Sequence, residues 1–403
     1  MQLNEELRDT LVLVLAGGTG TRLKPLTETR AKPAVPFGGA YRIIDFTLSN
    51  CIHSGLRRIY VLSQYRARSL EEHIRFAWNF LPLRLSQFIS VRPPHHGGEA
   101  NWYRGTADAI WQNLDALADE KPKHVVILSG DHIYRMDYGR MLEEHVNNGA
   151  ALTIGMVKIP VEESCRFGIF ECDLTGRVVS FEEKPSRGRE LADQPGQCLA
   201  SMGIYVFETG ELIRRLEADA QEPASSHDFG NDIIPQMIEE VPVHAHRFVE
   251  PGGGDRTYWR DVGTIEALFE ANLDLCAVEP QFNLYRQDWP TYTLWHNDPP
   301  AKAVLNADVI DSLMCPGVVV SGARLRRAVL SNRCQVEPGA TVEEAVLFSG
   351  VVIGEGARVQ RAIIDKWTVV PAGVEIGFDV EQDRARFSVS DTGIVTVPSK
   401  FAF

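Results

Sequence analysis

Short apolar runs alternate with amphipathic, helix-like stretches over the first two thirds of the chain. Continuous apolar runs of this length are typical of strands that are buried on both faces of a sheet. Their alternation with helices predicts an α/β fold with a mostly parallel sheet covered by helices. The runs are LVLVLA (11–16), RIYVLS (58–63), HVVILSG (124–130), ALTIGMV (151–157) and MGIYVF (202–207).

Near the C-terminus the pattern changes to a template that recurs every 17 residues. In each copy an apolar residue is followed three positions later by glycine, which is typical of a parallel β-helix whose coils stack an apolar interior and turn at glycine. Ordinary hairpins are the alternative, but they seldom keep a fixed interval. The copies are VVSGARL (319–325), VEPGATV (336–342), IGEGARV (353–359) and VPAGVEI (370–376), with first apolar positions Val319, Val336, Ile353 and Val370.

Between the two patterns lies EPQFNLYRQDWPTYTLWHNDPPAK (279–302), which has neither a helical nor a strand period. Its prolines and aromatic residues predict an ordered connector that packs on its neighbours. With about 100–200 residues per domain, a chain of 403 residues accommodates more than one domain. The expected organisation is an α/β domain over 1–278, the connector over 279–302 and a β-helix over 303–403.

Composition narrows the classes of partner. The chain has 41 Lys and Arg against 54 Asp and Glu, a net charge of −13, which argues against a nonspecific nucleic-acid binder. Its seven cysteines form no CxxC pair, which favours reduced thiols and a cytoplasmic location. The sequence contains no apolar run of about 18 residues, so no membrane span is expected.

Glycines follow the first apolar run and precede a basic cluster in LVLAGGTGTRLKPLTETRAKPAV (13–35). Glycine lets the backbone turn sharply and approach a ligand, so that amide groups face an anion. A polyphosphate also needs cations. The stretch is neither a Walker loop nor GxGxxG, and a strand and turn with a solvated basic edge is the alternative. The glycines are Gly17, Gly18 and Gly20, and the basic residues are Arg22, Lys24 and Lys32.

Two aspartates are candidates for a metal site. In HVVILSGD a buried strand ends at Gly130 and Asp131, at the edge where open α/β sheets bind ligands, and a carboxylate there suits Mg²⁺. Asp261 in YWRDVG is likewise followed by a glycine. The alternative for either acid is an N-cap or a turn. His132 matches no metal-ligand or catalytic pattern and is assigned no role.

Two further motifs are ambiguous when taken alone. In EEKP (182–185) the proline biases Lys184 towards an extended backbone, so the side chains of Glu183 and Lys184 should point opposite ways unless a turn intervenes. The motif is otherwise typical of a charged surface turn. In WYRGTADAI (102–110), Gly105 and Thr106 should begin a helix that continues through residues 107–117.

Together these motifs carry a resemblance. GGTGTRLxxLTxxxAKPAV resembles the signature of the sugar-1-phosphate nucleotidyltransferases, and six further stretches resemble the bacterial glucose-1-phosphate adenylyltransferases within that family. The resemblance spans most of the chain and implies a Rossmann-like, mostly parallel sheet followed by a left-handed parallel β-helix. The stretches are WYRGTADAI (102–110), SGDHIYRMDY (129–138), EEKP (182–185), ASMGIYVF (200–207), SSHDFGNDIIP (225–235) and YWRDVGT (258–264).

The resemblance also implies roles for individual residues. Arg22, Lys32 and Asp131 are implied to be catalytic, and Asp131 with Asp261 to hold Mg²⁺. The residues implied to bind the sugar phosphate are Tyr103, Gly168, Glu183, Lys184 and Ser201. Those implied to contact the nucleotide are Gly17, Gly18, Thr19, Gly20, Thr21, Gln64, Gly105 and Thr106.

The implied reaction is transfer of AMP from ATP to glucose 1-phosphate, which gives pyrophosphate and ADP-glucose, the glucosyl donor for glycogen synthesis. Family members are commonly homotetramers with small-molecule effectors bound between the two domains. Glycolytic intermediates activate them, and AMP, ADP or phosphate inhibits them. Arg42, Arg384 and Arg386 are the expected anion contacts in this sequence.

Two other hypotheses compete with this one. The glycine loop and EEKP recur across the superfamily, so the enzyme could use UTP or dTTP and make UDP- or dTDP-glucose. About four coils leave little room for the acetyltransferase groove of the bifunctional uridylyltransferases. A non-catalytic regulatory subunit is the third reading, against which the intact Arg22, Lys32, Asp131 and Lys184 argue.

Overall fold

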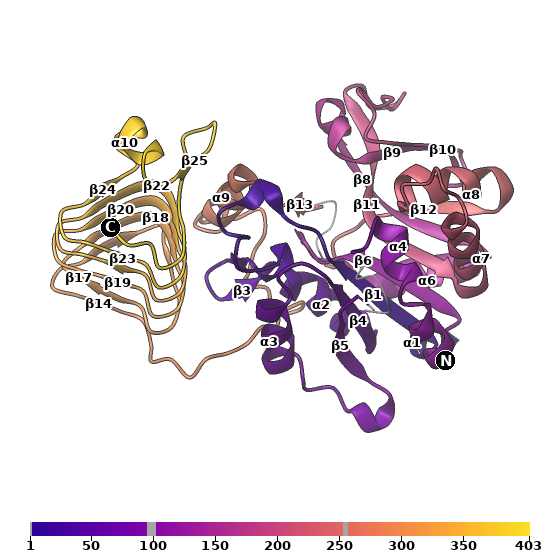
Figure 1. Ribbon diagram of the computed structural model, residues 1–403, viewed down its shortest axis with the longest axis horizontal. Helices are drawn as coiled ribbons and strands as arrows, with labels where there is room; N and C mark the ends of the chain where they lie inside the picture. The colour runs from indigo at the N-terminus through magenta and orange to yellow at the C-terminus, as the bar shows by residue number, and fades with distance from the viewer. Residues whose placement is uncertain (1, 95–101, 253–256) are drawn as a thin grey trace.

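One large mixed sheet forms the centre of the N-terminal domain (Figure 1). The structure is a computed structural model that describes residues 2–94, 102–252 and 257–403. Four neighbouring strands run parallel, as the apolar runs predicted, and the next strand joins them antiparallel. The order is β5 (Phe88–Arg92), β4 (Arg58–Ser63), β1 (Thr10–Ala16), β6 (His124–Ser129), β11 (Gln197–Glu208), β9 (Gly168–Cys172) and β10 (Val178–Glu183), with β8 (Leu152–Pro160) paired to β11 and to β12 (Val243–Arg247).

Helices cover both faces of this sheet, because alternate residues of a buried strand point to opposite sides. In β1, Val12 and Val14 pack with α2, α3 and α6, whereas Leu11 and Leu13 pack with α4, α5, α7 and α8. No helix in the described part of the chain is long and apolar enough to cross a bilayer. The helices are α1 (Gln2–Arg8), α2 (Ile43–His53), α3 (Arg68–Ala77), α4 (Thr106–Trp111), α5 (Leu114–Glu120), α6 (Tyr138–Asn147), α7 (Thr209–Ala220), α8 (Ile234–Glu240) and α9 (Ile265–Asp274).

The single helix predicted over residues 107–117 is wrong, because the structure has two helices, α4 and α5, with a break at Gln112 and Asn113. The side-chain amide of Asn113 donates to the carbonyl of Ala109 at 2.8 Å. The backbone amide of Asn113 donates to the carbonyl of Ile110. An asparagine that bonds nearby backbone groups competes with helix continuation. The break places Asn113 Nδ2 3.1 Å from the hydroxyl of Tyr103.

Short elements between the strands build the edge of the sheet where the candidate site lies. A two-stranded ladder pairs β7 (His132–Tyr134), which directly follows β6, with β13 (Trp259–Asp261). Their antiparallel register sets Asp261 opposite His132. The remaining short elements are β2 (Pro36–Phe37), β3 (Tyr41–Arg42) and the helical turns η1 (Thr21–Leu23), η2 (Lys32–Ala34), η3 (Leu83–Leu85), η4 (Val161–Arg166) and η5 (Phe229–Ile233).

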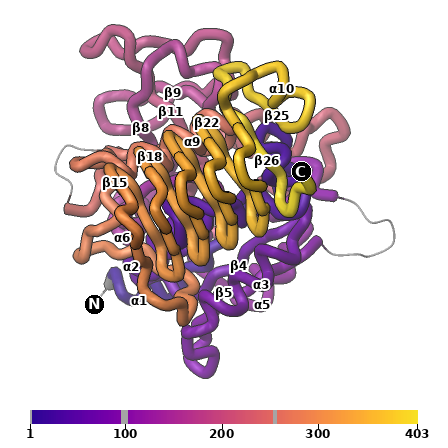
Figure 2. The backbone as a smooth tube through the Cα atoms, turned by 90° about the vertical axis from the view of Figure 1, so that its left-hand side faces the viewer, coloured from indigo at the N-terminus to yellow at the C-terminus, as the bar shows by residue number. Residues whose placement is uncertain are grey.

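The C-terminal domain is a stack of parallel coils, which confirms the predicted β-helix (Figure 2). Successive coils pair in register, and their inward residues form one continuous apolar core. The strands are β14 (Lys302–Val304), β15 (Asp308–Ile310), β16 (Leu313–Met314), β17 (Val319–Ser321), β18 (Arg324–Leu330), β19 (Gln335–Val336), β20 (Thr341–Leu347), β21 (Val352–Ile353), β22 (Arg358–Ile364), β23 (Val369–Val370), β24 (Glu375–Ile376), β25 (Ser388–Val389) and β26 (Val395–Val397), with α10 (Val380–Arg384) before the last pair.

The 17-residue template is offset by one residue in its first copy. Val336, Ile353 and Val370 are buried as expected, but the residue that pairs with Val336 is Val320 rather than Val319. Val320 is fully buried, whereas Val319 is only half-buried. In the first coil the glycine therefore follows the inward residue after two positions, whereas in the later coils it follows after three. The constant spacing between the glycines does not reveal this difference.

The two domains share an apolar interface. Helix α9, which begins soon after Asp261, packs against β18 and β20 of the β-helix, as Figure 1 shows. Val346 and Ile363 point out of their coils into this interface and are fully buried there. A buried ion pair lies beside it, because Arg30 Nη1 donates to Asp365 Oδ1 at 2.9 Å.

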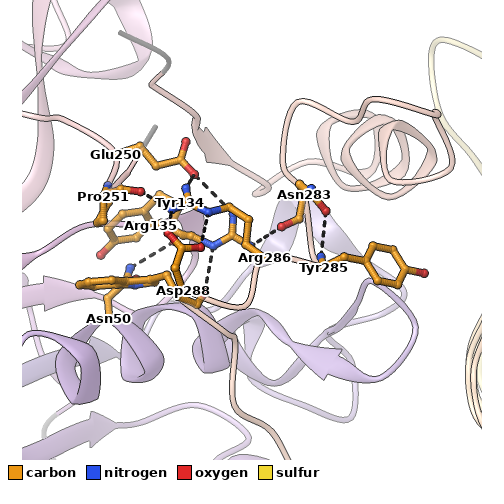
Figure 3. A network of polar contacts seen from close by, with 10 residues as sticks. Asn50, Tyr134, Arg135, Glu250, Pro251, Asn283, Tyr285, Arg286 and Asp288 are labelled. Carbon is orange, nitrogen blue, oxygen red and sulfur yellow. Dashed lines mark hydrogen bonds and ion pairs between the residues drawn. The ribbon is translucent and has the colours of Figure 1, made fainter. Parts of the chain in front are cut away.

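Residues 275–301 form no helix or strand, and yet they pack closely on the N-terminal domain (Figure 3). Arg135 and Arg286 share the buried carboxylate of Glu250, at 3.4 and 3.1 Å. The Arg135 guanidinium lies 4.1 Å from the ring centre of Phe282 and donates to the carbonyl of Trp289 at 3.3 Å. The prediction of a packed connector agrees with these contacts, and Arg135 directly follows β7.

The ion pair between Arg30 and Asp365 generates a stability prediction. Asp365→Ala should lower the free energy of unfolding by about 3–5 kcal/mol, because it leaves a buried guanidinium without its partner. Replacing both partners with apolar residues, Arg30→Met with Asp365→Leu, should cost less than the single change. Urea unfolding followed by fluorescence measures both. A double variant less stable than Asp365→Ala would show that the pair is not the source of the effect.

Candidate active site

A loop of glycines and threonines follows β1, and we call residues 17–21 the glycine loop. A Cβ on Gly17 would stand 3.2 Å from Gln64 Cβ and 3.4 Å from Tyr103 Cδ2, so glycine permits this close approach. Gly20 has a φ of +61°, a conformation that favours glycine. A Cβ on Gly18 would meet nothing within 4 Å, which leaves open space in front of the loop.

Three charged residues from distant parts of the chain meet at the edge of the sheet. Lys32 Nζ donates to Asp131 Oδ2 at 2.7 Å and to Asp261 Oδ1 at 3.1 Å. The lysine side chain is only 9% exposed. The structure therefore brings together Lys32, Asp131 and Asp261, three of the four residues that were predicted to be catalytic or to hold the metal, and the fourth, Arg22, lies 4.0 Å from Asp261. Below, Asp131 and Asp261 are called the carboxylate pair.

Local structure explains how each member reaches this point. Asp131 lies between β6 and β7, and Ser129 Oγ donates to its Oδ1. Asp261 ends β13, which the ladder with β7 holds in place. A Cβ on Gly263 would stand 2.6 Å from Lys32 Nζ and 2.8 Å from Asp261 Oδ1, so only a glycine fits there without displacing them.

Mutual charge fixes the ionisation of this cluster. Burial favours the neutral form of Lys32, but the negative charges of Asp131 and Asp261 outweigh burial and raise its pKa above the usual value. Burial likewise favours neutral carboxyls, yet Lys32 holds the pKa of Asp131 and that of Asp261 below their usual range. At neutral pH both carboxylates are ionised and the lysine is protonated.

The carboxylate pair has the donor set of a divalent-cation site. Single ligand atoms of Asp131, His132 and Asp261 lie within 4.8 Å of one another. Carboxylate oxygens are the ligands that hard cations such as Mg²⁺ prefer, so the residues fit such an ion. His132 matched no pattern that assigned it a role, but its Nε2 lies 3.5 Å from Asp131 Oδ1. Burial lowers the pKa of His132 and favours the neutral ring, which can bind a metal.

A cavity of about 420 Å³ opens beside the carboxylate pair. The residues predicted to contact the nucleotide largely line it. Tyr103, which was expected on the sugar side, lines the same cavity and donates its amide to Gln64 Oε1. Its lining includes Gly17, Gly18, Thr19, Gln64, Tyr103, Gly105, Thr106, Asp131 and Asp228.

A second group of predicted residues lies along β9, β10 and β11. A Cβ on Gly168 would collide with Phe181 and come within 2.7 Å of Glu183 Oε2. Ser201 is buried at a register shift in β11 and lies 3.4 Å from the hydroxyl of Tyr205. This group comprises Gly168, Glu183, Lys184 and Ser201.

The extended conformation expected for Lys184 is wrong. Its φ is +49°, which turns the backbone at the end of β10, and its amide donates to the carbonyl of Phe167 at 3.0 Å. The turn brings the ammonium of Lys184 onto the carboxylate of Glu183, so the two side chains lie on the same side. The Lys184 side chain is 59% exposed and accessible to a ligand.

The segment at residues 226–230 joins the two groups. Asp228 Oδ2 accepts from Thr106 Oγ1 at 2.9 Å and lines the cavity. A Cβ on Gly230 would collide with the carboxylate of Glu183. Asp228 was missed as a site residue, although it lies in SSHDFGNDIIP, one of the stretches that carried the resemblance. Only its contact with Thr106, which is 122 residues away, reveals its position.

The three arginines predicted to bind effectors have different surroundings. Arg42 donates to the carbonyl and hydroxyl of Ser69 at 2.6 and 2.9 Å. Arg384 pairs with Glu381 at 3.3 Å and Arg386 with Asp383 at 3.0 Å, both within the α10 segment. Arg42, the last residue of β3, bonds the N-terminal domain, whereas the other two arginines contact acids of their own segment.

Comparison with known proteins matches both domains. The nucleotidyl transferase family model covers residues 11–278. The chain belongs to the nucleotidyl transferase family. The GlmU-like C-terminal hexapeptide model covers residues 299–397, and these two matches agree with the sheet and the coils described above. The resemblance inferred from the motifs is thereby confirmed.

Several relatives within this family share almost the whole chain. A glucose-1-phosphate adenylyltransferase of Rhodopirellula baltica is 47% identical, with 97% of this chain and 90% of the relative covered. One of Hydrogenovibrio crunogenus is 48% identical, with 97% and 94% covered. One of Nitrosospira multiformis is 46% identical, with 97% and 94% covered. The enzyme is therefore a nucleotidyltransferase.

The tight packing around Gly263 generates a prediction. Gly263→Ala should push Lys32 Nζ and Asp261 Oδ1 apart, and turnover should fall about 100-fold because misplaced catalytic groups are costly. Its thermal midpoint should fall only slightly, because a small shift of Lys32 Nζ and Asp261 Oδ1 relieves the close contact without Lys32 leaving the carboxylate pair. Gly18→Ala, which meets no neighbour, should keep the wild-type midpoint and weaken nucleotide binding. Full activity of Gly263→Ala would contradict the need for this geometry.

Proposed function

We propose that this protein transfers AMP from ATP to glucose 1-phosphate, forming ADP-glucose and pyrophosphate. The observation that carries the proposal is Lys32 held between Asp131 and Asp261, at distances of 2.7 and 3.1 Å. This cluster lies beside the cavity that the glycine loop lines. The relatives described above are named for this activity, which supports the choice of substrates.

The reaction requires alignment of anions rather than a strong general base. The phosphate of glucose 1-phosphate is already ionised, so an oxygen of it can attack the α-phosphorus of ATP. The bond from that phosphorus to the pyrophosphate oxygen breaks, and negative charge gathers on the leaving group. Catalysis then depends on holding two mutually repelling molecules together and on fixed positive charge.

Asp131 and Asp261 hold the divalent cofactor, which we take to be Mg²⁺. When bound, the ion supplies positive charge beside the reacting phosphates. Lys32 keeps both carboxylates ionised and fixed in position. Because Lys32 is buried and bonded to both, it cannot swing away.

Cationic side chains near the cavity neutralise the substrates. Arg22 and Lys32 contact the nucleotide phosphates and the leaving pyrophosphate, together with amides of the glycine loop. Lys184 contacts the phosphate of glucose 1-phosphate, and its exposed ammonium is free to turn from Glu183 to a ligand. The residues that contact the nucleotide further are Gly17, Gly18, Thr19, Gly20, Thr21, Gln64, Gly105 and Thr106.

The glucose ring is held by polar groups near the end of β11. Glu183 accepts hydrogen bonds from the glucose hydroxyls, and Ser201 donates a hydrogen bond to them. Gly168 leaves room for the Glu183 carboxylate. Tyr103 lines the nucleotide cavity with its ring edge towards the glycine loop, and its hydroxyl bonds Asn113. It therefore contacts the sugar phosphate from the nucleotide side.

In the cell, the product serves as the glucosyl donor for glycogen synthesis. The enzyme works in the cytoplasm as a homotetramer with a catalytic domain (1–278), a connector (279–302) and a regulatory β-helix (303–403). The contacts of α9 and the connector with both domains support this division.

Small anionic metabolites regulate the enzyme at the domain interface. Arg30, Arg42 and Lys366 lie close enough for their charges to interact, and Asp365 is bonded to Arg30. Burial, followed by the positive charges of Arg42 and Arg30, lowers the pKa of Lys366 to about 7. This surplus of positive charge favours a phosphorylated effector. Arg384 and Arg386 bind such an effector only if they leave Glu381 and Asp383.

The proposed reaction predicts a nucleotide preference and a need for Asp131. Purified protein with Mg²⁺ and glucose 1-phosphate should release pyrophosphate fastest with ATP. Asp131→Asn should slow release at least about 100-fold, because one of the groups that position charge in the transition state is lost. The exposed Asp193→Asn is the control and should keep wild-type rates. Preference for UTP or dTTP would favour the other transferases, and no release would favour a regulatory subunit.

The pKa of Lys366 predicts pH-dependent anion binding. As pH rises through about 7, Lys366 loses its proton and the cluster loses one positive charge. Sulfate, which stays fully ionised, should bind up to about tenfold more tightly at pH 6 than at pH 8, because the protonated fraction falls about tenfold. Calorimetry measures both affinities. Lys366→Met should flatten the profile, and an unchanged profile would exclude Lys366 from the site.

A further inference from the structure

Asp261 has more cationic neighbours than the sequence motifs indicated. Its Oδ1 accepts from Lys32, whereas its Oδ2 lies 3.5 Å from Arg166 Nη2 and 4.0 Å from Arg22 Nη2. Arg166 belongs to none of the motifs that pointed to the site. It is the last residue of η4, the turn between β8 and β9.

Arg166 reaches Asp261 from the sugar side of the cleft. The next residue, Phe167, packs its ring 5.2 Å from that of Trp259 on β13, and its carbonyl accepts the amide of Lys184. A cleft of about 520 Å³ lies between η4 and the β13–α9 segment, and Arg166 and Asp261 both line it. The guanidinium therefore links the segment that positions Lys184 to a member of the carboxylate pair.

Charge around the carboxylate pair changes when a divalent ion enters. Lys32, Arg22 and Arg166 already surround two carboxylates, so the ion adds repulsion. Lys32 is 9% exposed and bonded to both acids, so it has no room to move to another partner. Arg166 is 37% exposed and has a second carboxylate, Glu163 Oε2, at 3.8 Å. Of these three cations, Arg166 has a visible alternative partner.

We propose that Arg166 is a positioning residue that competes with the divalent ion for Oδ2 of Asp261. Without the ion, its guanidinium holds η4 and Phe167 against β13. Entry of the ion transfers the guanidinium to Glu163 and releases η4 from Asp261. Metal loading is thereby coupled to the segment that presents Lys184 to the sugar phosphate.

Ion binding without substrates tests this directly. Free Mn²⁺, counted by its electron paramagnetic resonance signal during titration, gives the dissociation constant. Arg166→Gln should bind Mn²⁺ about three- to tenfold more tightly than wild type, because a partly exposed competing charge is removed. Arg166→Lys should stay near wild type. The matched control is Arg187→Gln, whose guanidinium pairs with Glu190 at 2.8 Å, and it should not change the constant.

Hydrogen exchange supplies a second measurement. In wild type, saturating Mn²⁺ should speed amide exchange in a peptide that covers residues 161–168. In Arg166→Gln the same peptide should exchange fast with or without the ion. Unchanged or weaker Mn²⁺ binding by Arg166→Gln, or an ion response of the peptide equal to that of wild type, would overturn the proposal.

The inference rests on the proposed metal site, and one variant separates the two. Asp261→Asn should bind Mn²⁺ much more weakly than wild type. If it binds equally well, the metal site itself is wrong. If Asp261→Asn loses the ion while Arg166→Gln matches wild type, the metal site stands and only the competition by Arg166 is wrong.

Discussion

Repulsion between two partly buried carboxylates is the constraint on which the rest of the site depends. Asp131 and Asp261 can remain ionised side by side only because Lys32 lies between them. The lysine comes from the turn after the glycine loop, one acid from the end of a central strand, and the other from a ladder strand far along the chain. A small error in any of these elements would leave a buried charge uncompensated, so the fold must specify all three.

The β-helix takes part in this specification. Arg30, two residues before Lys32, is bonded to Asp365 of the β-helix. Helix α9, shortly after Asp261, packs on its coils. The connector encloses Arg135, which directly follows β7. Each member of the charged cluster thus lies a few residues from a contact with the connector or the second domain. An effector bound between the domains would therefore act on the charged cluster through these same contacts.

Much of the fold was accessible from the sequence because its signals are local. Apolar runs of six or seven residues located the central strands, and a constant interval located the coils. Prediction failed where individual polar contacts decided the outcome. The helix after Thr106 ends at Trp111, and the side chain of Asn113 in the break bonds the backbone of Ala109 and the hydroxyl of Tyr103. Lys184 has a φ of +49°, and its amide bonds Phe167, which is 17 residues earlier in the chain. The β7–β13 ladder has three-residue strands, too short to carry a period.

Glycines show why motifs locate a site without explaining it. In a sequence, glycine suggests a turn that needs positive φ, and Gly20 is such a case. Gly105, Gly168, Gly230 and Gly263 differ: none has positive φ, and a Cβ on each would strike a partner distant in sequence. Gly168 and Gly230 leave room for the Glu183 side chain, Gly263 leaves room for that of Lys32, and Gly105 leaves room for the backbone of residues 226–227. Arg166 illustrates the same limit, because only the structure reveals that its guanidinium lies 3.5 Å from Asp261.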